Sequence, residues 1–216
     1  MSLRRIALAL AALTLLGSGS AAAAAAPATP AAGAGVPADA LQGDMSLGDP
    51  KAPVHVIEYA SASCPHCAHF DEETFPAFRK KYVDTGRVYY TLKEFLTPPA
   101  DVAAAGFILA RCGGQAKYFT ILDQVYRSQP EWGVVDINQI FLDIGKANGL
   151  SEAKVKACFA DPAAVDALNA RVAAAMNADK VTSTPTFDVN GKRIEGAVPL
   201  SDLDAAIAEA EKARRR

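Results

Sequence analysis

The chain has 216 residues, of which 50% are hydrophobic, and it carries a formal net charge of −2 at pH 7. This length suits one domain, or one domain with an insertion, and leaves room for a substantial core. The weakly negative charge excludes the net basic field with which nucleic-acid-binding proteins attract their ligand, so we expect no nucleic-acid partner.

The N-terminus has the pattern of a secretory signal peptide. Residues 1–5 form a short basic region, residues 6–16 are apolar, and the alanines at 21–26 offer A-x-A cleavage sites. The apolar segment is shorter than the roughly 20 residues that a membrane-spanning helix needs. The pattern predicts a signal peptide over residues 1–26, cleaved about residues 24–26, and a flexible leader over residues 27–46.

The first predicted strand leads directly into a pair of cysteines. Residues 54–59 (VHVIEY) are short, apolar and β-branched, which is typical of a strand. From Pro65 aromatic residues recur at helical spacing through Tyr82, and Pro76 is expected to kink this helix. A turn then precedes a second predicted strand at residues 88–92.

A block of helices is predicted in the middle of the chain, after a break at two consecutive prolines. Asp136, Ser151 and Asp161 are placed to accept a hydrogen bond from a first-turn N–H, and Gly113 and Gly149 are placed to end helices. The predicted helices of this block cover residues 101–112, 116–127, 136–147, 151–159 and 161–177.

Strand character returns near the C-terminus. Residues 186–189 and 192–194 flank Asn190 and Gly191, a dipeptide that favours the tight turn of a β-hairpin. Ser201 is predicted to cap a last helix, which extends to about residue 214.

The order of these elements indicates an α/β protein. A strand–helix–strand unit is followed by helices only, then by a hairpin and a final helix. We therefore expect an α/β core formed by residues 47–97 and 180–216, interrupted by an all-helical insertion at residues 98–179.

The cysteine pair lies in the sequence CPHC, where the strand ends and the helix begins. Unpaired N–H groups and the positive end of the helix dipole favour the thiolate of Cys64, and His66 adds a donor beside it. The thiolate is the nucleophile of disulfide exchange, and a stabilised thiolate makes the corresponding disulfide more oxidising. We predict that Cys64 is the attacking or attacked sulfur and that Cys67, one turn further in, resolves the mixed disulfide.

The cysteine pair could also serve three other purposes. Covalent haem attachment needs a histidine directly after the second cysteine, but Ala68 stands there. Zinc needs about four ligands, and Cys64, Cys67, His66 and His69 have no second CxxC pair to help them. A purely structural disulfide closes almost no loop and so stabilises little. We expect no metal and no cofactor, although metal binding and a structural bridge stay open as weaker alternatives.

These motifs resemble the DsbA-type periplasmic disulfide oxidoreductases, which have a thioredoxin-like fold. The resemblance rests on CPHC after VHVIEYAS, on the helical insertion, and on TSTPTFDVNGK at residues 182–192, and it extends from Gly43 to the C-terminus. It implies that Pro65 belongs to the active-site motif, that Pro185 is a cis-proline, and that the backbone of Thr184 lies against the cysteine pair. Some oxidases have an aliphatic residue where this chain has Thr184.

The resemblance implies further roles. Glu58, in the strand before the CPHC motif, corresponds to a buried acid that accepts a proton from Cys67, and Lys93 could be the partner of this acid from the neighbouring strand. Burial would raise the pKa of Glu58. Cys112 and Cys158 correspond to a second disulfide found in some members of the family, for which a structural role is expected.

The resemblance also implies a function. The expected protein is a monomeric periplasmic thiol oxidase that donates its disulfide to folding secreted proteins with free thiols. A DsbB-type, quinone-linked membrane oxidase would reoxidise it. A disulfide isomerase or reductase on the same fold is the alternative, but those usually add an N-terminal oligomerisation segment. A metal-binding chaperone is the weaker third interpretation.

Overall fold

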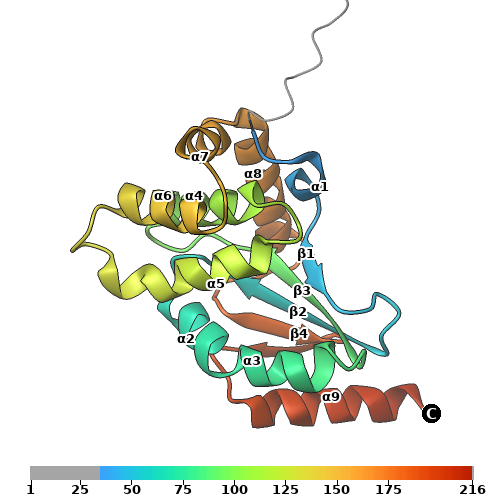
Figure 1. Cartoon of the computed structure of the whole chain (residues 1–216). Coiled ribbons are helices and arrows are strands. Elements are labelled where there is room, and N and C mark those ends of the chain that lie inside the picture. Colours follow the sequence, from blue (N-terminus) through green and yellow to red (C-terminus); the bar gives the residue numbers. More distant parts are fainter. Residues whose placement is uncertain (1–34, 216) are drawn as a thin grey trace, which may run out of the picture. The chain divides into compact units, whose positions relative to one another are not determined.

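The computed structural model describes residues 35–215 of the chain (Figure 1). The predicted signal peptide, residues 1–26, lies outside this range, as does the first part of the predicted leader. None of the helices within residues 35–215 is long and apolar enough to cross a membrane.

A five-stranded sheet in the order β1-β3-β2-β4-β5 forms the centre of the fold. β2 and β3 pair in parallel, whereas the other neighbours are antiparallel. A parallel pair requires a crossover between its strands, and here helices supply it. The strands are β1 (Met45–Leu47), β2 (Val54–Ala60), β3 (Val88–Glu94), β4 (Thr186–Val189) and β5 (Lys192–Glu195).

Helices surround this sheet. In Figure 1 the helices α4 to α8 form the insertion on one side of the strands. The helices α3 and α9 lie on the other side. This mixed α/β arrangement with an inserted helical block confirms the predicted fold class. The helices are α1 (Ala38–Leu41), α2 (Pro65–Glu73), α3 (Phe75–Phe78), α4 (Ala100–Cys112), α5 (Tyr118–Ser128), α6 (Ile137–Ala147), α7 (Glu152–Phe159), α8 (Pro162–Asn177) and α9 (Leu200–Arg214).

The helix starts of the insertion follow the predicted caps. The side chains of Asp136, Ser151 and Asp161 each accept a hydrogen bond from a backbone N–H in the first turn of α6, α7 and α8. The last helix differs from the prediction, because α9 begins after Pro199 and Ser201 makes no capping bond. The hydroxyl of Ser201 instead lies 3.3 Å from the neighbouring Asp202 carboxylate.

Two local differences concern where ordered structure begins and where the first long helix breaks. α1 and β1 both start within the predicted leader, and β1 pairs with the edge of β3, where it buries Met45. The first long helix breaks at Thr74, just before Pro76, and continues as α3 and a π-helical turn at Arg79–Val83. A proline lacks the N–H that would continue the helix, which explains the break.

The two faces of the sheet have different covers. Glu58 shares a face with its register partners Leu92 and Phe187, and Phe187 packs on Phe70 of α2 at 4.6 Å between ring centroids. Side chains alternate between faces along a strand, so Lys93 lies on the opposite face. That face contacts the C-terminal end of α8. The acid in β2 is therefore beneath the cysteine-bearing helix.

A buried acid fixes the helical insertion to the sheet. Glu94, the last residue of β3, accepts hydrogen bonds from Arg111 of α4 at 2.6 Å and from Arg171 of α8 at 2.7 Å. Tyr118 of α5 donates to the same carboxylate at 3.0 Å. Three helices of the insertion thus converge on one strand end, close to the start of the insertion.

Candidate active site

The cysteine pair lies where β2 passes into α2. Cys64 is the N-cap residue of α2, and Pro65 occupies the first turn, where its missing N–H costs no helical hydrogen bond. Cys64 is 6% exposed and Cys67 is 0% exposed, and both are free thiols. Of the two cysteines, only Cys64 therefore reaches the surface.

A loop from the far end of the chain forms the wall opposite Cys64. The Thr184–Pro185 peptide bond is cis, and β4 follows directly after it. The Cys64 thiol donates a hydrogen bond to the backbone oxygen of Thr184 at 3.4 Å. The hydroxyl of Thr184 is buried and has no partner in this thiol form. This wall therefore places polar backbone atoms beside the Cys64 sulfur.

The surroundings of the two thiols shift their pKa values in opposite directions. A hydrogen bond from the Cys67 thiol lowers the pKa of Cys64 to about 5 against the opposing effect of burial, with smaller contributions from the Thr184 side chain and from the N–H groups of Cys67 and His66. Burial, together with the hydrogen bond to Cys64 and its charge, raises the pKa of Cys67 well above its ordinary value. Near neutral pH Cys64 is thus a thiolate and Cys67 a thiol.

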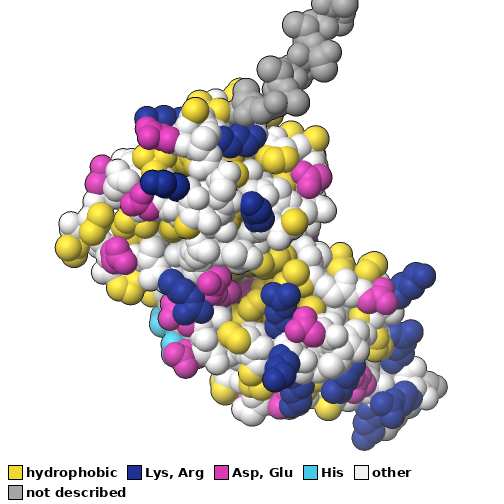
Figure 2. Space-filling view, viewed as in Figure 1, with side chains coloured by type: hydrophobic (Ala, Val, Ile, Leu, Met, Phe, Trp, Pro, Cys, Tyr) yellow, Lys and Arg dark blue, Asp and Glu magenta, His cyan; other side chains and the backbone are white. Residues whose placement is uncertain are grey.

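His66 contacts the Cys64 sulfur through its backbone. The contribution of His66 to the Cys64 thiolate comes from its backbone N–H. Its side chain is exposed, and Figure 2 shows histidine side chains at the surface over α2. A role of the imidazole in stabilising the thiolate stays a prediction.

Glu58 lies beneath the cysteine pair and is 3% exposed. Its carboxylate accepts a hydrogen bond from the hydroxyl of Tyr90 at 2.5 Å. Burial, with small additions from the charges of Asp71 and Cys64, raises the pKa of Glu58 to about 8, against the opposing effect of the Tyr90 hydrogen bond. A carboxyl group with such a pKa can give and take protons close to neutral pH.

Lys93 is not the partner of this acid, contrary to the expectation from the sequence. Its ammonium group binds the carboxylate of Asp179 at 2.7 Å and lies over the ring of Tyr59. The reason is the strand alternation, which places Lys93 and Glu58 on opposite faces of the sheet. Tyr90 takes the position of hydrogen-bond partner instead.

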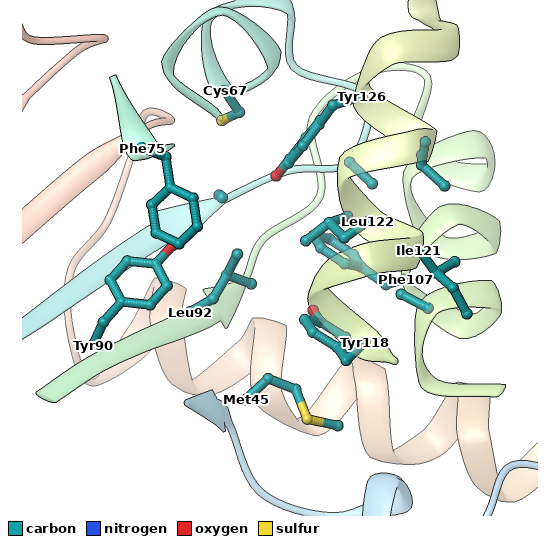
Figure 3. Close-up of a cluster of buried hydrophobic side chains, with 14 of the residues drawn as sticks. Met45, Cys67, Phe75, Tyr90, Leu92, Phe107, Tyr118, Ile121, Leu122 and Tyr126 are labelled. Carbon is teal, nitrogen blue, oxygen red and sulfur yellow. The ribbon is translucent and has the colours of Figure 1, made fainter. Parts of the chain in front are cut away.

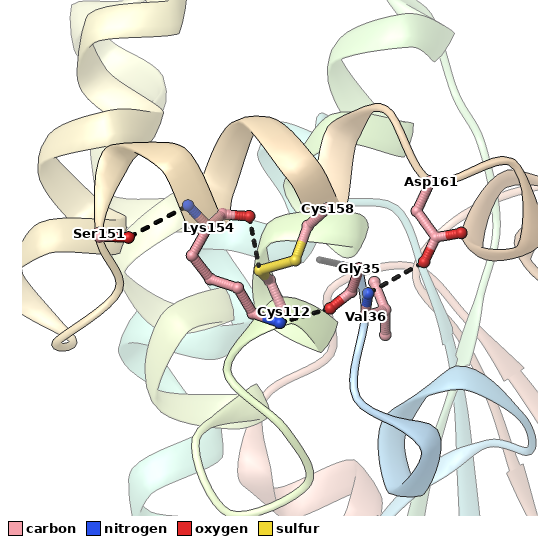
Figure 4. Close-up of a disulfide and its surroundings, with 7 residues drawn as sticks. All are labelled: Gly35, Val36, Cys112, Ser151, Lys154, Cys158 and Asp161. Carbon is pink, nitrogen blue, oxygen red and sulfur yellow. Dashed lines mark hydrogen bonds between the residues drawn. A yellow bond between two sulfur atoms is a disulfide. The ribbon is translucent and has the colours of Figure 1, made fainter. Parts of the chain in front are cut away.

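The other two cysteines form a disulfide away from this site. Cys112 of α4 and Cys158 of α7 are bonded, with 5.9 Å between their Cα atoms and a sequence separation of 46. Figure 4 shows the N-terminal segment beside this bridge, where Lys154 donates to the oxygen of Gly35 and Asp161 accepts from the N–H of Val36. The bridge connects two helices of the insertion.

Sequence reasoning missed three residues around the cysteine pair. Tyr90 faces Glu58 because of strand alternation, a signal that becomes usable once the pairing of β2 with β3 is known. The side-chain amide of Gln129 donates to the oxygens of Ala62 and Cys64 at 3.0 and 3.4 Å. Tyr126 of α5 points toward the same region (Figure 3). The last two come from the insertion, and no local pattern marks them.

The fold and the cysteine geometry define a class. A low-pKa cysteine at a helix N-terminus lies beside a cis-proline loop at the end of two paired strands of a mixed sheet. This is the arrangement of thioredoxin-fold proteins that exchange thiols and disulfides. Within residues 35–215 no group of three or more His, Cys, Asp or Glu side chains is positioned to hold a metal ion.

Comparison with known proteins gives the family. The family model described as "Thioredoxin" matches residues 40–209, so the chain belongs to the thioredoxin family. A provisionally named protein-disulfide oxidoreductase of Rickettsia bellii is 33% identical over 171 residues, and one of Rickettsia typhi is 36% identical over 169 residues. These alignments cover 78 and 77% of this chain but 65 and 62% of the relatives, so the chain spans less than two thirds of their length.

Solved structures place the chain within the DsbA type of this family. The crystal structure of α-DsbA1 from Wolbachia pipientis has a TM-score of 0.72 and 27% identity, over 79% of this chain and 92% of that chain. BdbD from Bacillus subtilis has a TM-score of 0.64 at 20% identity, over 83% of this chain and 97% of that chain, which supports the fold alone.

Proposed function

We propose that this chain is an exported protein-disulfide oxidoreductase that acts as a thiol oxidase and donates a Cys64–Cys67 disulfide to folding secreted proteins. The observation that carries the proposal is the contrast between the two cysteines. The pKa of Cys64 is lowered to about 5, whereas the pKa of the buried Cys67 is raised well above its ordinary value. Stabilising its thiolate stabilises the reduced protein and makes the disulfide a stronger oxidant. The relatives with oxidoreductase names support the same reaction.

The proposed reaction has two exchange steps. A substrate thiolate attacks the Cys64 sulfur of the disulfide, the Cys64–Cys67 bond breaks, and Cys67 leaves with the electron pair and takes a proton from the protonated Glu58. A second substrate thiolate then attacks the substrate sulfur of the mixed disulfide and releases Cys64 as a thiolate. The substrate gains a disulfide and the enzyme is left reduced. The wall at Thr184 and Pro185 offers backbone groups to the substrate chain.

A titration in glutathione tests whether the pair is oxidising. The purified protein is equilibrated in a series of reduced and oxidised glutathione, and the fraction of Cys64–Cys67 disulfide is measured by thiol alkylation and mass. A potential close to about −120 mV, the value of DsbA, supports an oxidase. A potential close to about −270 mV, the value of thioredoxin, overturns the oxidase proposal and favours a reductase.

Single cysteine variants test the order of attack. Cys64→Ser is expected to abolish thiol oxidation, because it removes the one cysteine of the pair that reaches the surface. Cys67→Ser is expected to accumulate mixed disulfides with substrate, because Cys67 can no longer attack the Cys64 sulfur and release the substrate. If Cys64→Ser traps substrate and Cys67→Ser does not, the assigned roles are reversed.

The cellular setting completes the proposal. The predicted signal peptide supports export to the periplasm, and a DsbB-type, quinone-linked membrane oxidase is the partner that we propose for reoxidation. The protein is proposed to work as a monomer. Cell fractionation with N-terminal sequencing of the mature protein, reoxidation assays with membranes and quinone, and sedimentation test these three statements. The metal content of the purified protein distinguishes an oxidase from a metal-binding chaperone.

A further inference from the structure

Besides the hydroxyl of Thr184, a second buried hydroxyl near the cysteine pair has no hydrogen-bond partner. Tyr126, on α5, is 2% exposed, and its hydroxyl oxygen is fully buried without a donor or acceptor in reach. Native proteins satisfy the great majority of their buried polar groups, and each exception calls for an explanation. A phenylalanine would fill the same space without an unsatisfied oxygen, so the hydroxyl costs folding free energy in this state of the protein.

The hydroxyl is directed at the active site. Figure 3 shows the ring of Tyr126 extending from α5 toward β2, with its oxygen on the side where Cys67 lies. α5 packs directly against α2, the helix that carries Cys67. Burial raises the pKa of the Tyr126 hydroxyl, and the charges of Cys67, Glu58, Asp71 and Tyr90 raise it further, with Cys67 first among them. The unpartnered donor thus lies among the groups of the exchange reaction, with Cys67 foremost.

We propose that the hydroxyl of Tyr126 donates a hydrogen bond to the Cys67 thiolate that forms when the disulfide opens. The inference rests on the proposed function, since it concerns the leaving group of the first exchange step. A neutral thiol is a weak acceptor, and in the reduced form the hydroxyl makes no hydrogen bond to Cys67. A thiolate is a charged acceptor, and hydrogen bonds to charged groups are about twice as strong as neutral ones.

The electrostatics of Cys67 make such a donor necessary. Cys67 is 0% exposed, and its burial opposes a negative charge on the sulfur. When the substrate thiolate attacks Cys64, the electron pair of the broken S–S bond moves to Cys67 before the proton arrives from Glu58. An O–H bond aimed at this sulfur lowers the energy of that charge at the moment it develops, and it stabilises the transition state more than the starting disulfide.

The neighbouring tyrosine cannot take this part. Tyr90 already donates to Glu58 at 2.5 Å, so its only hydrogen atom is committed. Burial, together with the charge of Asp123 and a hydrogen bond with it, raises the pKa of Asp71 to about 8, so the carboxyl proton of Asp71 is engaged with Asp123. Within the described part of the chain, Tyr126 is therefore the residue of the insertion whose hydroxyl is free to donate to Cys67.

Tyr126→Phe tests the inference, with Tyr82→Phe as a matched control. The Tyr82 hydroxyl donates to Asp204 at 2.6 Å near α9, far in the fold from the cysteine pair. We measure the rate at which glutathione reduces the oxidised, full-length mature protein, as a function of pH, together with the urea midpoint. Tyr126→Phe is expected to lower the rate about tenfold, the order of one hydrogen bond to a charged group, with an unchanged or higher urea midpoint. Tyr82→Phe is expected to keep the wild-type rate and to lose some stability.

Two results would overturn the inference. One is a Tyr126→Phe rate within about twofold of wild type, since a hydrogen bond to a charged group is worth more than that. The other is an unchanged pKa of Cys67 when Tyr126→Phe is added to a Cys64→Ser background, because loss of a donor to the thiolate should raise it. This second measurement follows the alkylation of Cys67 against pH and needs no turnover. If the wild-type protein itself does not react with glutathione, the proposed function fails instead.

Discussion

The thiol of Cys64 and the backbone oxygen of Thr184 lie 3.4 Å apart although 120 residues separate them in sequence. The contact exists because β2, which leads to Cys64, pairs with β4, which follows Thr184. The sheet therefore positions the reactive sulfur against the cis-proline loop, and the insertion folds outside this contact. Substitutions at the cysteine pair can therefore be interpreted on the assumption that the pairing of β2 with β4 is retained.

We predict that the reduced protein is more stable than the oxidised protein at pH 7, and that the difference shrinks as the pH falls. The pKa of Cys64 is lowered from 9.0 to about 5 by the fold. A lowered pKa contributes stability that is complete above the unfolded value and is lost as the pH falls through the folded value. Thermal unfolding of both redox forms between pH 4 and pH 8 measures the difference.

Direct detection of the Cys64 thiolate is the control for this stability prediction. Absorbance near 240 nm of the reduced protein should rise with a midpoint about pH 5, and Cys64→Ala should remove the rise. An oxidised form that is the more stable one throughout this pH range would contradict the assigned thiolate.

Glu58→Gln is predicted to flatten the pH dependence of stability. The pKa of Glu58 is raised from 4.5 to about 8 in the folded protein, so its contribution is complete below pH 4.5 and is lost as the pH rises toward 8. Each pH unit in this window carries up to about 1.4 kcal/mol. Urea unfolding of wild type and variant at several pH values should diverge with rising pH, with Glu58→Gln the more stable at pH 8.

Tyr90→Phe is the companion variant for Glu58. The hydrogen bond from Tyr90 lowers the pKa of Glu58, so its removal should move the pH transition further upward. A pH dependence that is the same in wild type, Glu58→Gln and Tyr90→Phe would show that this acid does not titrate in the expected window.

Local patterns in the sequence were sufficient for much of the fold. The strand before CPHC, the Asn190–Gly191 hairpin and the caps at Asp136, Ser151 and Asp161 depend on neighbours within a few residues, and the structure has them in the predicted places. α1 and β1 were missed because they are very short and because β1 forms through pairing with the distant β3.

The site shows the same division between local and distant information. The position of Cys64 at the start of α2 follows from the motif and the turn around it. The partner of Glu58 depends on which strand face each residue occupies, and this is why Lys93 was proposed and Tyr90 was not. Gln129 and Tyr126 reach the site only through the packing of the insertion on α2, which no short stretch of sequence encodes.

Loss of the Cys112–Cys158 bridge is predicted to destabilise the protein without removing thiol exchange. The bridge closes a loop with a sequence separation of 46 residues between α4 and α7, which corresponds to about 4 kcal/mol in the chain-entropy model. The double variant Cys112→Ala with Cys158→Ala should unfold at clearly lower urea and still form mixed disulfides at Cys64. Unchanged stability would show that packing alone holds α7 in place.

Glu94→Gln is predicted to destabilise the protein strongly. The Glu94 side chain is 0% exposed and binds both Arg111, which is 2% exposed, and Arg171, which is 10% exposed. Removing its charge leaves two arginines facing each other in the interior, and breaking a buried ion pair in this way costs about 3–5 kcal/mol.

Asp179→Asn is the matched control for Glu94→Gln, because it breaks the partly exposed pair with Lys93. The two side chains of that pair are 25 and 26% exposed, so the loss should be at most about 1 kcal/mol. Urea unfolding at neutral pH compares the two variants directly. Equal losses would mean that the Glu94 network is solvated in solution and does not anchor the insertion, whereas a large loss for Glu94→Gln alone places the anchor at the end of β3.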